Sequence, residues 1–305
     1  MNASAEQRMA KFLLWVSPAF ISSNYINAKA ASGEITPHLM ALIRWSVALC
    51  LMLVASWSRL DSAMKLTSKE YLQILTLGGL GMWICGAFVY EAAFSTSTTN
   101  IALIYAVTPV AIAVVSACES AVNFQPRHWI GMVLALLGVL FVISKGHMAS
   151  LSSVQLAKGD FWIVGAATSW VAYTILMKRW PSELSPTVRL FAVTAAGVLI
   201  LVPCTAVEAI YEGYLILTLR GVLLATIAGV VPGYVAYKAY AFLIQQLGPA
   251  QAGLVMYLSP VYAALFAWVL LGESPSWFHY VGAAMILPSI YLVTAESHLI
   301  EPEYP

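Results

Sequence analysis

Charged side chains are scarce in this sequence. Only 10% of its 305 residues are Asp, Glu, Lys or Arg, whereas 61% are hydrophobic. Soluble domains carry about 25% charged and about 45–50% apolar residues. The apolar residues recur along the whole chain, so the composition predicts an integral membrane protein. The net charge of +1 and the lack of a Lys/Arg-rich segment exclude nucleic acid as an expected partner.

Motifs that indicate catalysis or energy coupling are also missing. The sequence contains no Gly-x-x-x-x-Gly-Lys-Ser/Thr loop, no His-Glu-x-x-His and no Gly-x-Ser-x-Gly. Its four cysteines stand apart without a Cys-x-x-Cys, and its five histidines are scattered over expected loops and span ends. We therefore expect no cofactor, no metal site and no enzymatic activity. A membrane-embedded enzyme and a channel without alternating access remain the alternatives.

What the sequence does contain is long apolar runs. A membrane-crossing helix needs about 20 mostly apolar residues. Runs of this kind are separated by turn and charge signals such as Ser32-Gly33-Glu34 and Gly248-Pro249. The ten expected spans are 11–31, 38–58, 71–93, 98–118, 127–145, 159–179, 187–207, 220–243, 249–270 and 277–296.

One stretch of the chain occurs twice. An offset of 151 residues aligns Pro109 with Pro260, His128 with His279 and Gly131 with Gly282 without a gap. Matches between apolar residues arise easily by chance, but coincident prolines, histidines and glycines indicate an internal duplication. The polar link at 146–158 separates a first repeat, 1–150, from a second repeat with a short acidic tail, 151–305.

The duplication also predicts the topology. Nine of the 15 Lys and Arg residues fall on the side of the amino terminus and four on the other side, so both termini are expected in the cytoplasm. Five spans per repeat is an odd number, so the second repeat enters the membrane upside down. Such inverted repeats are typical of carriers that work by alternating access. The expected fold is therefore all-α, with ten transmembrane helices in two inverted five-helix repeats.

The second repeat carries a family resemblance. The segment from Gly248 through Pro260 to Gly272-Glu273 resembles the EamA-type repeat of the drug/metabolite transporter superfamily, as do the positions of Trp15, Trp170 and Pro37. The first repeat departs from this pattern, because Cys118-Glu119-Ser120 stands where a Gly-Glu pair is expected. The resemblance implies ten helices, cytoplasmic termini and export or exchange of small metabolites.

Polar and aromatic side chains within the spans are candidates for a binding cavity, because lipid cannot satisfy buried amides and charges. Aromatic rings add stacking and cation–π contacts, which suit an amphipathic substrate. Packing between helices is the alternative for each aromatic residue, and contact with headgroups is the alternative for Lys238. The candidate substrate-binding residues are Asn24, Tyr25, Trp83, Tyr90, Asn100, Tyr105, Trp170, Tyr173, Tyr234, Tyr237, Lys238, Gln251 and Tyr257.

Two further pairs stand out. Arg44 and Glu91 are expected at similar depth, so we predict an ion pair that acts as a gate or a structural tie, with substrate contact by Arg44 as the alternative. Pro109 and Pro260 occupy matching positions and are predicted hinges, with static kinks as the alternative.

Together these features predict a multi-pass secondary transporter of the inner (plasma) membrane. It would export or exchange a small organic metabolite, with an amino acid or a similar amphipathic compound as first choice, by alternating access. The expected partners are this small molecule and the lipid bilayer. The sequence leaves proton coupling and a homodimer open.

Overall fold

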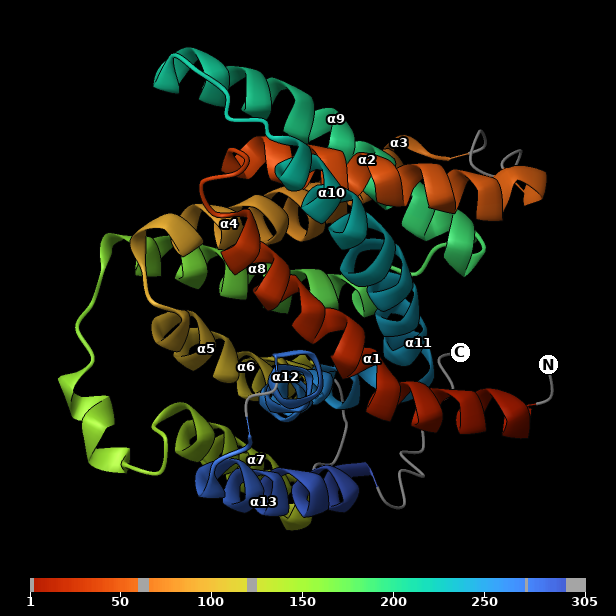
Figure 1. Ribbon diagram of the computed structural model, residues 1–305. Helices are drawn as coiled ribbons and strands as arrows, with labels where there is room; N and C mark the ends of the chain where they lie inside the picture. The colour runs from red at the N-terminus through yellow and green to blue at the C-terminus, as the bar shows by residue number, and fades with distance from the viewer. Residues whose placement is uncertain (1–2, 60–65, 120–124, 272–273, 295–305) are drawn as a thin grey trace.

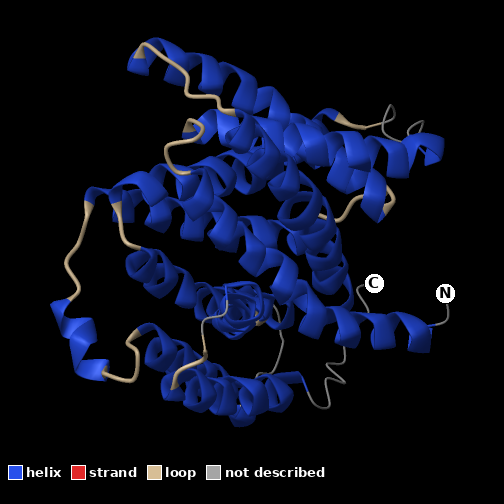
Figure 2. Cartoon of the chain, viewed as in Figure 1, coloured by secondary structure: helices blue, strands red, loops and turns tan. Residues whose placement is uncertain are grey.

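The computed structural model describes residues 3–59, 66–119, 125–271 and 274–294, and these residues are nearly all helical (Figures 1 and 2). No strand occurs among them; the one extended contact is an isolated bridge between Ile35 and Leu217. The all-helical prediction is therefore confirmed. The helices are α1 (Ala3–Ala31), α2 (Pro37–Ser56), α3 (Ser68–Gly78), η2 (Gly79–Ile84), α4 (Cys85–Ser95), α5 (Thr98–Ala106), α6 (Thr108–Glu119), α7 (Pro126–Ile143), η3 (Met148–Ser153), α8 (Lys158–Arg179), α9 (Pro186–Glu212), α10 (Leu219–Ala228), η4 (Gly229–Val235), α11 (Ala236–Gly253), α12 (Val255–Leu271) and α13 (Trp277–Thr294).

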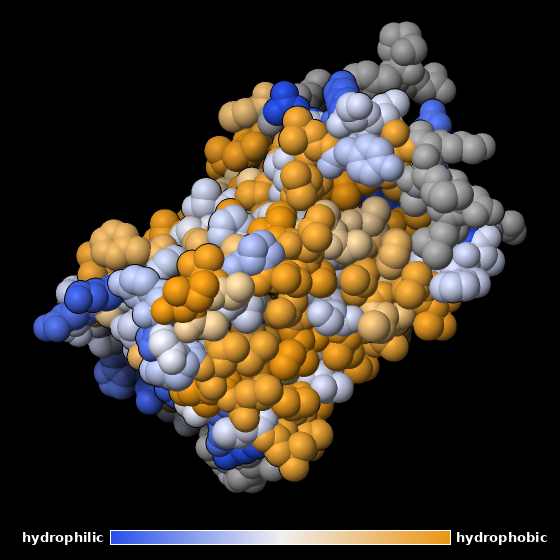
Figure 3. All heavy atoms as spheres, turned by 90° about the horizontal axis from the view of Figure 1, so that it is seen from above, coloured by the Kyte–Doolittle hydropathy of each residue, from blue (hydrophilic) through white to orange (hydrophobic). Residues whose placement is uncertain are grey.

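Length and hydropathy assign these helices to a membrane. Within the described ranges, seven helices are long and apolar enough to cross it, and Val255–Phe266 and Trp277–Val293 are shorter apolar helices. Figure 3 shows an apolar surface across the middle of one face, with hydrophilic side chains toward its ends. The expected count of ten spans stays a prediction.

Local signals explain where several helices begin and end. Proline occupies the first turn of α2, α7 and α9, where its missing N–H costs no hydrogen bond. Thr67 and Glu70 form a capping box at the start of α3, in which each side chain accepts a backbone N–H of the other residue. Gly213 ends α9 with φ of 74°, a conformation that a side chain would disfavour.

The two repeats pack with exchanged contacts. Gly131 of α7 lies against Val293 of α13, and Gly282 of α13 lies against Val142 of α7. Positions 131 and 282 correspond through the offset of 151, and so do 142 and 293. Each contact is therefore the counterpart of the other, as a pseudo-two-fold axis between repeats requires. The corresponding pairs α7–α13 and α2–α9 pack at opposite ends of the view in Figure 1.

Both repeats also contain a π-helical turn. Segment η2, Gly79–Ile84, interrupts the third expected span, and η4, Gly229–Val235, interrupts the eighth. The offset of 151 residues aligns η2 with residues 230–235, which lie within η4. A π-turn widens the helix and leaves carbonyl groups out of the regular i→i−4 pattern, and such turns are frequent at functional sites.

The predicted hinge prolines lie in unequal surroundings. Pro109 follows a one-residue break at Val107 that separates α5 from α6. Pro260 lies inside α12, whose nearest break is at Leu254. A further break occurs at Gly248, where φ of 79° and ψ of 166° interrupt α11. Each proline therefore follows an interruption of the helix, and the interruptions at Val107 and Leu254 do not correspond through the offset of 151 residues.

Candidate functional site

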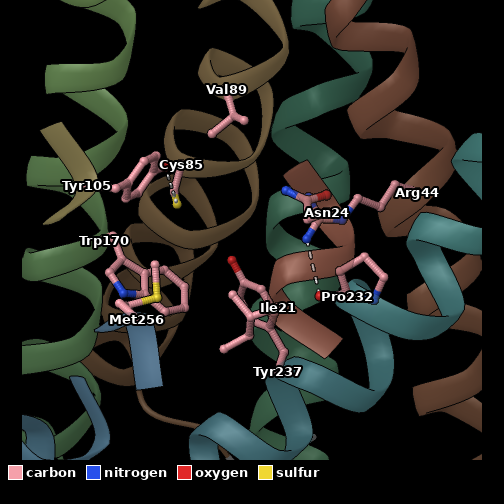
Figure 4. A pocket seen from close by; sticks show the side chains of 10 residues that line it. All are labelled: Ile21, Asn24, Arg44, Cys85, Val89, Tyr105, Trp170, Pro232, Tyr237 and Met256. Atoms are coloured by element: carbon pink, nitrogen blue, oxygen red, sulfur yellow. Dashed lines mark hydrogen bonds between the residues drawn. The ribbon is translucent and has the colours of Figure 1, made fainter. Parts of the chain in front are cut away.

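A small polar pocket lies between helices of both repeats. Its volume is about 50 Å³, and residues from α1, α2, α4, α5, α8, α11, α12 and the π-turn η4 surround it (Figure 4). Five of the lining residues were predicted from the sequence as binding or gating residues. The lining residues are Ile21, Asn24, Arg44, Cys85, Val89, Tyr105, Trp170, Pro232, Tyr237 and Met256.

Arg44 is the charged group of this pocket, and its side chain is only 4% exposed. Its Nη1 donates to the hydroxyl of Tyr90 at 3.1 Å, and its Nη2 donates to the carbonyl of Pro232 at 3.2 Å. The guanidinium also lies 4.6 Å from the ring centroid of Trp45. Its Nε has no hydrogen-bond partner among the described residues. All the described partners of this buried cation are therefore neutral.

The hydroxyl of Tyr90 links Arg44 of α2 to Asn24 of α1. It accepts from Arg44 and donates to Oδ1 of Asn24 at 3.0 Å. Asn24 lines the pocket, whereas Tyr90 lies beside it and is 2% exposed. These two linked hydrogen bonds fix the position of the guanidinium from one side, because a phenol hydroxyl can accept one hydrogen bond while donating another.

The two π-turns hold the other side. Tyr237 donates its hydroxyl to the carbonyl of Gly81 in η2 at 3.0 Å, and Arg44 donates to Pro232 in η4. Gly81 and Pro232 correspond through the offset of 151. Corresponding carbonyls of the two π-turns therefore each receive a hydrogen bond from a side chain that lines the pocket.

Aromatic rings form a wall of the pocket, which Trp170 and Tyr237 line. Trp170 stacks on Tyr240 with centroids 4.7 Å apart and on Tyr173 at 5.7 Å. Tyr237 contacts Trp45 edge to face at 4.7 Å and Trp170 at 5.6 Å. These rings lie against one another in arrangements that the aromatic quadrupole favours, so the wall is preformed.

A larger apolar chamber adjoins the polar pocket. Its volume is about 370 Å³, and Val89, Tyr105 and Met256 line both spaces. Lys29, near the end of α1, and His279, near the start of α13, also line the chamber. The combined space is therefore amphipathic, with a cationic pocket and an apolar chamber that falls within the usual ligand-site range of about 300–1,000 Å³.

Other predicted binding residues lie elsewhere. Asn100 donates to both carboxylate oxygens of Asp160, at 3.0 and 2.8 Å, and thereby ties α5 to the first turn of α8. Lys238 is exposed, and its ammonium lies 5.5 Å from the ring centroid of Tyr234 rather than in the pocket. Trp83 packs against Phe88 at 6.2 Å. None of Asn100, Lys238 and Trp83 lines the polar pocket.

Three further candidates complete this comparison. Tyr257 and Gln251 are buried, and neither lines the polar pocket. The Tyr257 hydroxyl has no hydrogen-bond partner in the described part of the chain. The side chain of Tyr25 falls outside the described set.

The predicted ion pair between Arg44 and Glu91 is wrong. Oε1 of Glu91 lies 3.1 Å from Nδ1 of His38, and Oε1 of Glu208 lies at the same distance from that nitrogen. Glu91 belongs to the last turns of α4, whereas Arg44 lies about two turns inside α2 from His38. Equal expected depth was therefore an insufficient criterion, because Glu91 meets the beginning of α2.

The sequence reading missed several important residues. His38 was expected in a loop or at a span end, and Glu208 lies just beyond the expected span 187–207, yet the two side chains meet across α2 and α9. Cys85 and Val89 reach the pocket because α4 follows the π-turn η2. The paired glycine-rich segments at 78–81 and 229–233 were the available signal for these turns.

Comparisons with known proteins agree with this architecture. The model of the EamA-like transporter family matches residues 8–144 and 157–295, one match in each repeat. An uncharacterized transporter of Archaeoglobus fulgidus is 23% identical over 300 residues, covering 98% of this chain and 100% of that protein. The uncharacterized inner membrane transporter YedA of Escherichia coli (strain K12) is 22% identical, with coverages of 95% and 90%.

A solved structure shares the fold. One chain of that structure, described as "Crystal structure of protein", superposes on this protein with a TM-score of 0.75 at 16% sequence identity. The similarity covers 96% of this chain and 99% of that one. The helical arrangement described above is therefore that of an experimentally observed fold.

Proposed function

This chain belongs to the EamA-like transporter family of membrane transporters, and from that premise we propose that it exports or exchanges a small organic carboxylate by alternating access. An amino acid or a similar amphipathic compound with an apolar side chain fits best. The single observation that carries this proposal is the buried guanidinium of Arg44, which faces a pocket with neutral partners only.

The Arg44 guanidinium is a charge buried within the helix bundle. An ionised side chain in a membrane interior is costly unless a partner of opposite charge or a polar cavity compensates it. Among the described residues no carboxylate pairs with Arg44, while Tyr90 and Pro232 hold two of its donors. An incoming carboxylate would supply the missing negative charge, and a guanidinium can bind it through two hydrogen bonds.

The shape of the space supports the rest of the substrate. The polar pocket of about 50 Å³ has room for a carboxylate but not for a whole metabolite. The adjoining chamber of about 370 Å³ can take an apolar side chain, and Val89, Tyr105 and Met256 lie where the two spaces meet. This arrangement favours an amphipathic anion over a sugar or an organic cation.

The repeats supply the transport mechanism. The pocket is lined by helices of both repeats, among them the corresponding pairs α1 and α8 and α5 and α12, and a carrier of this kind rocks one repeat against the other around a central site. We further propose that the chain resides in the inner membrane with both termini in the cytoplasm, from the distribution of Lys and Arg.

Counterflow in proteoliposomes tests the proposal. Vesicles loaded with one unlabelled compound from a panel of amino acids, nucleosides, sugar phosphates and organic cations would be diluted into labelled compound. We expect saturable, trans-stimulated uptake for amino acids with apolar side chains and a large loss of uptake for their carboxamide analogues. Preference for organic cations, or flux that neither saturates nor responds to internal substrate, would contradict it.

A further inference from the structure

A second polar cluster lies apart from the central pocket. His38 at the start of α2, Glu91 near the end of α4 and Glu208 near the end of α9 converge, and none of them lines the pocket or the apolar chamber. Their side chains are 15%, 26% and 7% exposed. One ligand atom from each lies within 4.8 Å of the others. We refer to these three residues as the His38 cluster.

We propose that the His38 cluster binds a divalent transition-metal cation of the Zn²⁺ class. The hydrogen-bond geometry of the three side chains supports a cation between them. Oε1 of Glu91 and Oε1 of Glu208 each lie 3.1 Å from the same nitrogen, Nδ1 of His38. A ring nitrogen carries a single N–H, which cannot point well at two oxygens at once. A cation between the three atoms satisfies all of them.

Two of the three separations between ligand atoms match such an ion. Zn²⁺ binds imidazole nitrogen at about 2.0–2.1 Å and carboxylate oxygen at about 2.0–2.2 Å, so neighbouring ligand atoms of a tetrahedral site lie about 3.3 Å apart. The two nitrogen–oxygen distances of 3.1 Å are close to that separation. Three protein ligands leave the fourth position to water, as in other sites that Zn²⁺ shares with solvent.

The charges also match. When the imidazole gives up its proton to bind a metal, the two carboxylates leave two negative charges, which a divalent cation neutralises. Glu91 and Glu208 both lie in the last turns of their helices, where the carbonyl ends favour a cation, whereas only His38 lies at a helix start. In the described part of the chain, Arg44 bonds to neutral groups and Arg220 pairs with Glu34, so neither supplies this charge.

Glu208 is held in the orientation that a ligand needs. The backbone N–H of His38 donates to its Oε1 at 2.9 Å, and that of Leu39 donates to its Oε2 at 3.3 Å. A carboxylate oxygen that accepts one hydrogen bond retains a second lone pair for a metal. Such outer bonds orient metal ligands and raise affinity.

Occupancy of this site would affect movement between the repeats. His38 and Glu91 belong to the first repeat and Glu208 to the second. A bound cation would therefore connect the repeats at one end of the bundle.

The test uses untagged full-length protein in detergent, titrated with Zn²⁺ by calorimetry and with Co²⁺ by visible absorption. Exposed Cys50 and Cys118 are replaced by serine in all samples, because free thiols also bind zinc. We expect one Zn²⁺ per chain, a Co²⁺ spectrum of low coordination number and a thermal midpoint that rises with metal. His38→Gln and Glu91→Gln should each weaken binding by about tenfold or more.

Matched controls are available elsewhere in the chain. His147→Gln and Glu183→Gln remove the same groups from exposed positions and should leave binding unchanged. Glu91→Gln keeps the hydrogen bonds that the backbone of α2 donates to the Glu208 carboxylate, so a normal thermal midpoint without metal would show that the fold is intact. Absence of saturable binding in the parent, or unchanged binding in both His38→Gln and Glu91→Gln, would overturn the proposal. Stability that depends on pH but not on metal would assign the cluster to an imidazolium–carboxylate contact and overturn it equally. No transport substrate is needed, so this result is independent of the proposed function.

Discussion

Replacing Arg44 with glutamine removes the cation of the central pocket while keeping a polar side chain that can still donate to a carbonyl. We expect Arg44→Gln to reach the membrane in normal amount and to lose high affinity for carboxylate substrates. The variant avoids a new buried charge, and the loss therefore reports on substrate rather than on folding. The neighbours Tyr90 and Pro232 are neutral, so neither is left with an unpaired charge.

The size of the effect follows from the donors of the guanidinium. Arginine has five N–H groups. Tyr90 and Pro232 each accept one, and the buried Nε–H has no partner in the described set, which leaves three donors for a ligand. A carboxylate that accepts two of them gains about 1.5–3 kcal/mol for each charged hydrogen bond. Losing both corresponds to about 3–6 kcal/mol, or about 10²- to 10⁴-fold weaker binding.

The assay compares a carboxylate substrate with its carboxamide in both proteins. Wild-type protein should prefer the carboxylate by about 10²-fold or more, and Arg44→Gln should bind the two compounds alike. Arg8→Gln, an exposed arginine in the first turns of α1, serves as the matched control and should behave as wild type. If Arg44→Gln kept the preference for the carboxylate, the role of Arg44 in substrate binding would be wrong.

Two further substitutions test other parts of the structure. Lys238→Ala should transport at the wild-type rate, because the ammonium is exposed beside Tyr234; a complete loss in a protein of normal abundance would instead favour the binding role first inferred from sequence. Gly131→Ala should lower stability by about 1–3 kcal/mol, because the added Cβ would lie 2.7 Å from Cγ2 of Val293 and 2.9 Å from the Ser289 carbonyl oxygen. Thermal unfolding measures this loss, with Gly79→Ala as control because its Cβ meets only Ile200 at 3.5 Å; equal midpoints for the two variants would contradict the close approach of α7 and α13.

The helical fold was predictable because lipid imposes long apolar helices that can be read directly from composition. The matching residues Gly131 and Gly282 likewise predicted the duplication, and their exchanged contacts with Val293 and Val142 are its consequence. Helix interruptions were harder to place. Helix α12 continues through Pro260, whereas α11 is interrupted at Gly248. The packing of neighbouring helices determines which of the residues that favour a bend produces one.

A position between the helices was predictable for residues whose polar groups lipid cannot satisfy, whereas depth alone did not predict which partners a side chain meets. Arg44, Asn24 and Tyr237 are costly to expose to lipid, and each lines the pocket. Depth along a helix does not specify the direction of a side chain, and Lys238 is exposed rather than part of the pocket lining. His38 and Glu208 are 170 residues apart in sequence, and only tertiary packing brings them together.

Tyr237 and Arg44 donate hydrogen bonds to main-chain oxygens of the two π-turns. The shape of each span therefore determines which side-chain groups are held in the pocket to meet a ligand. If either turn rewound by a single residue into regular helix, its oxygen would return to a main-chain amide and one side chain in the pocket would lose its anchor. Straightening a span and releasing what lies between the repeats would then be the same physical event.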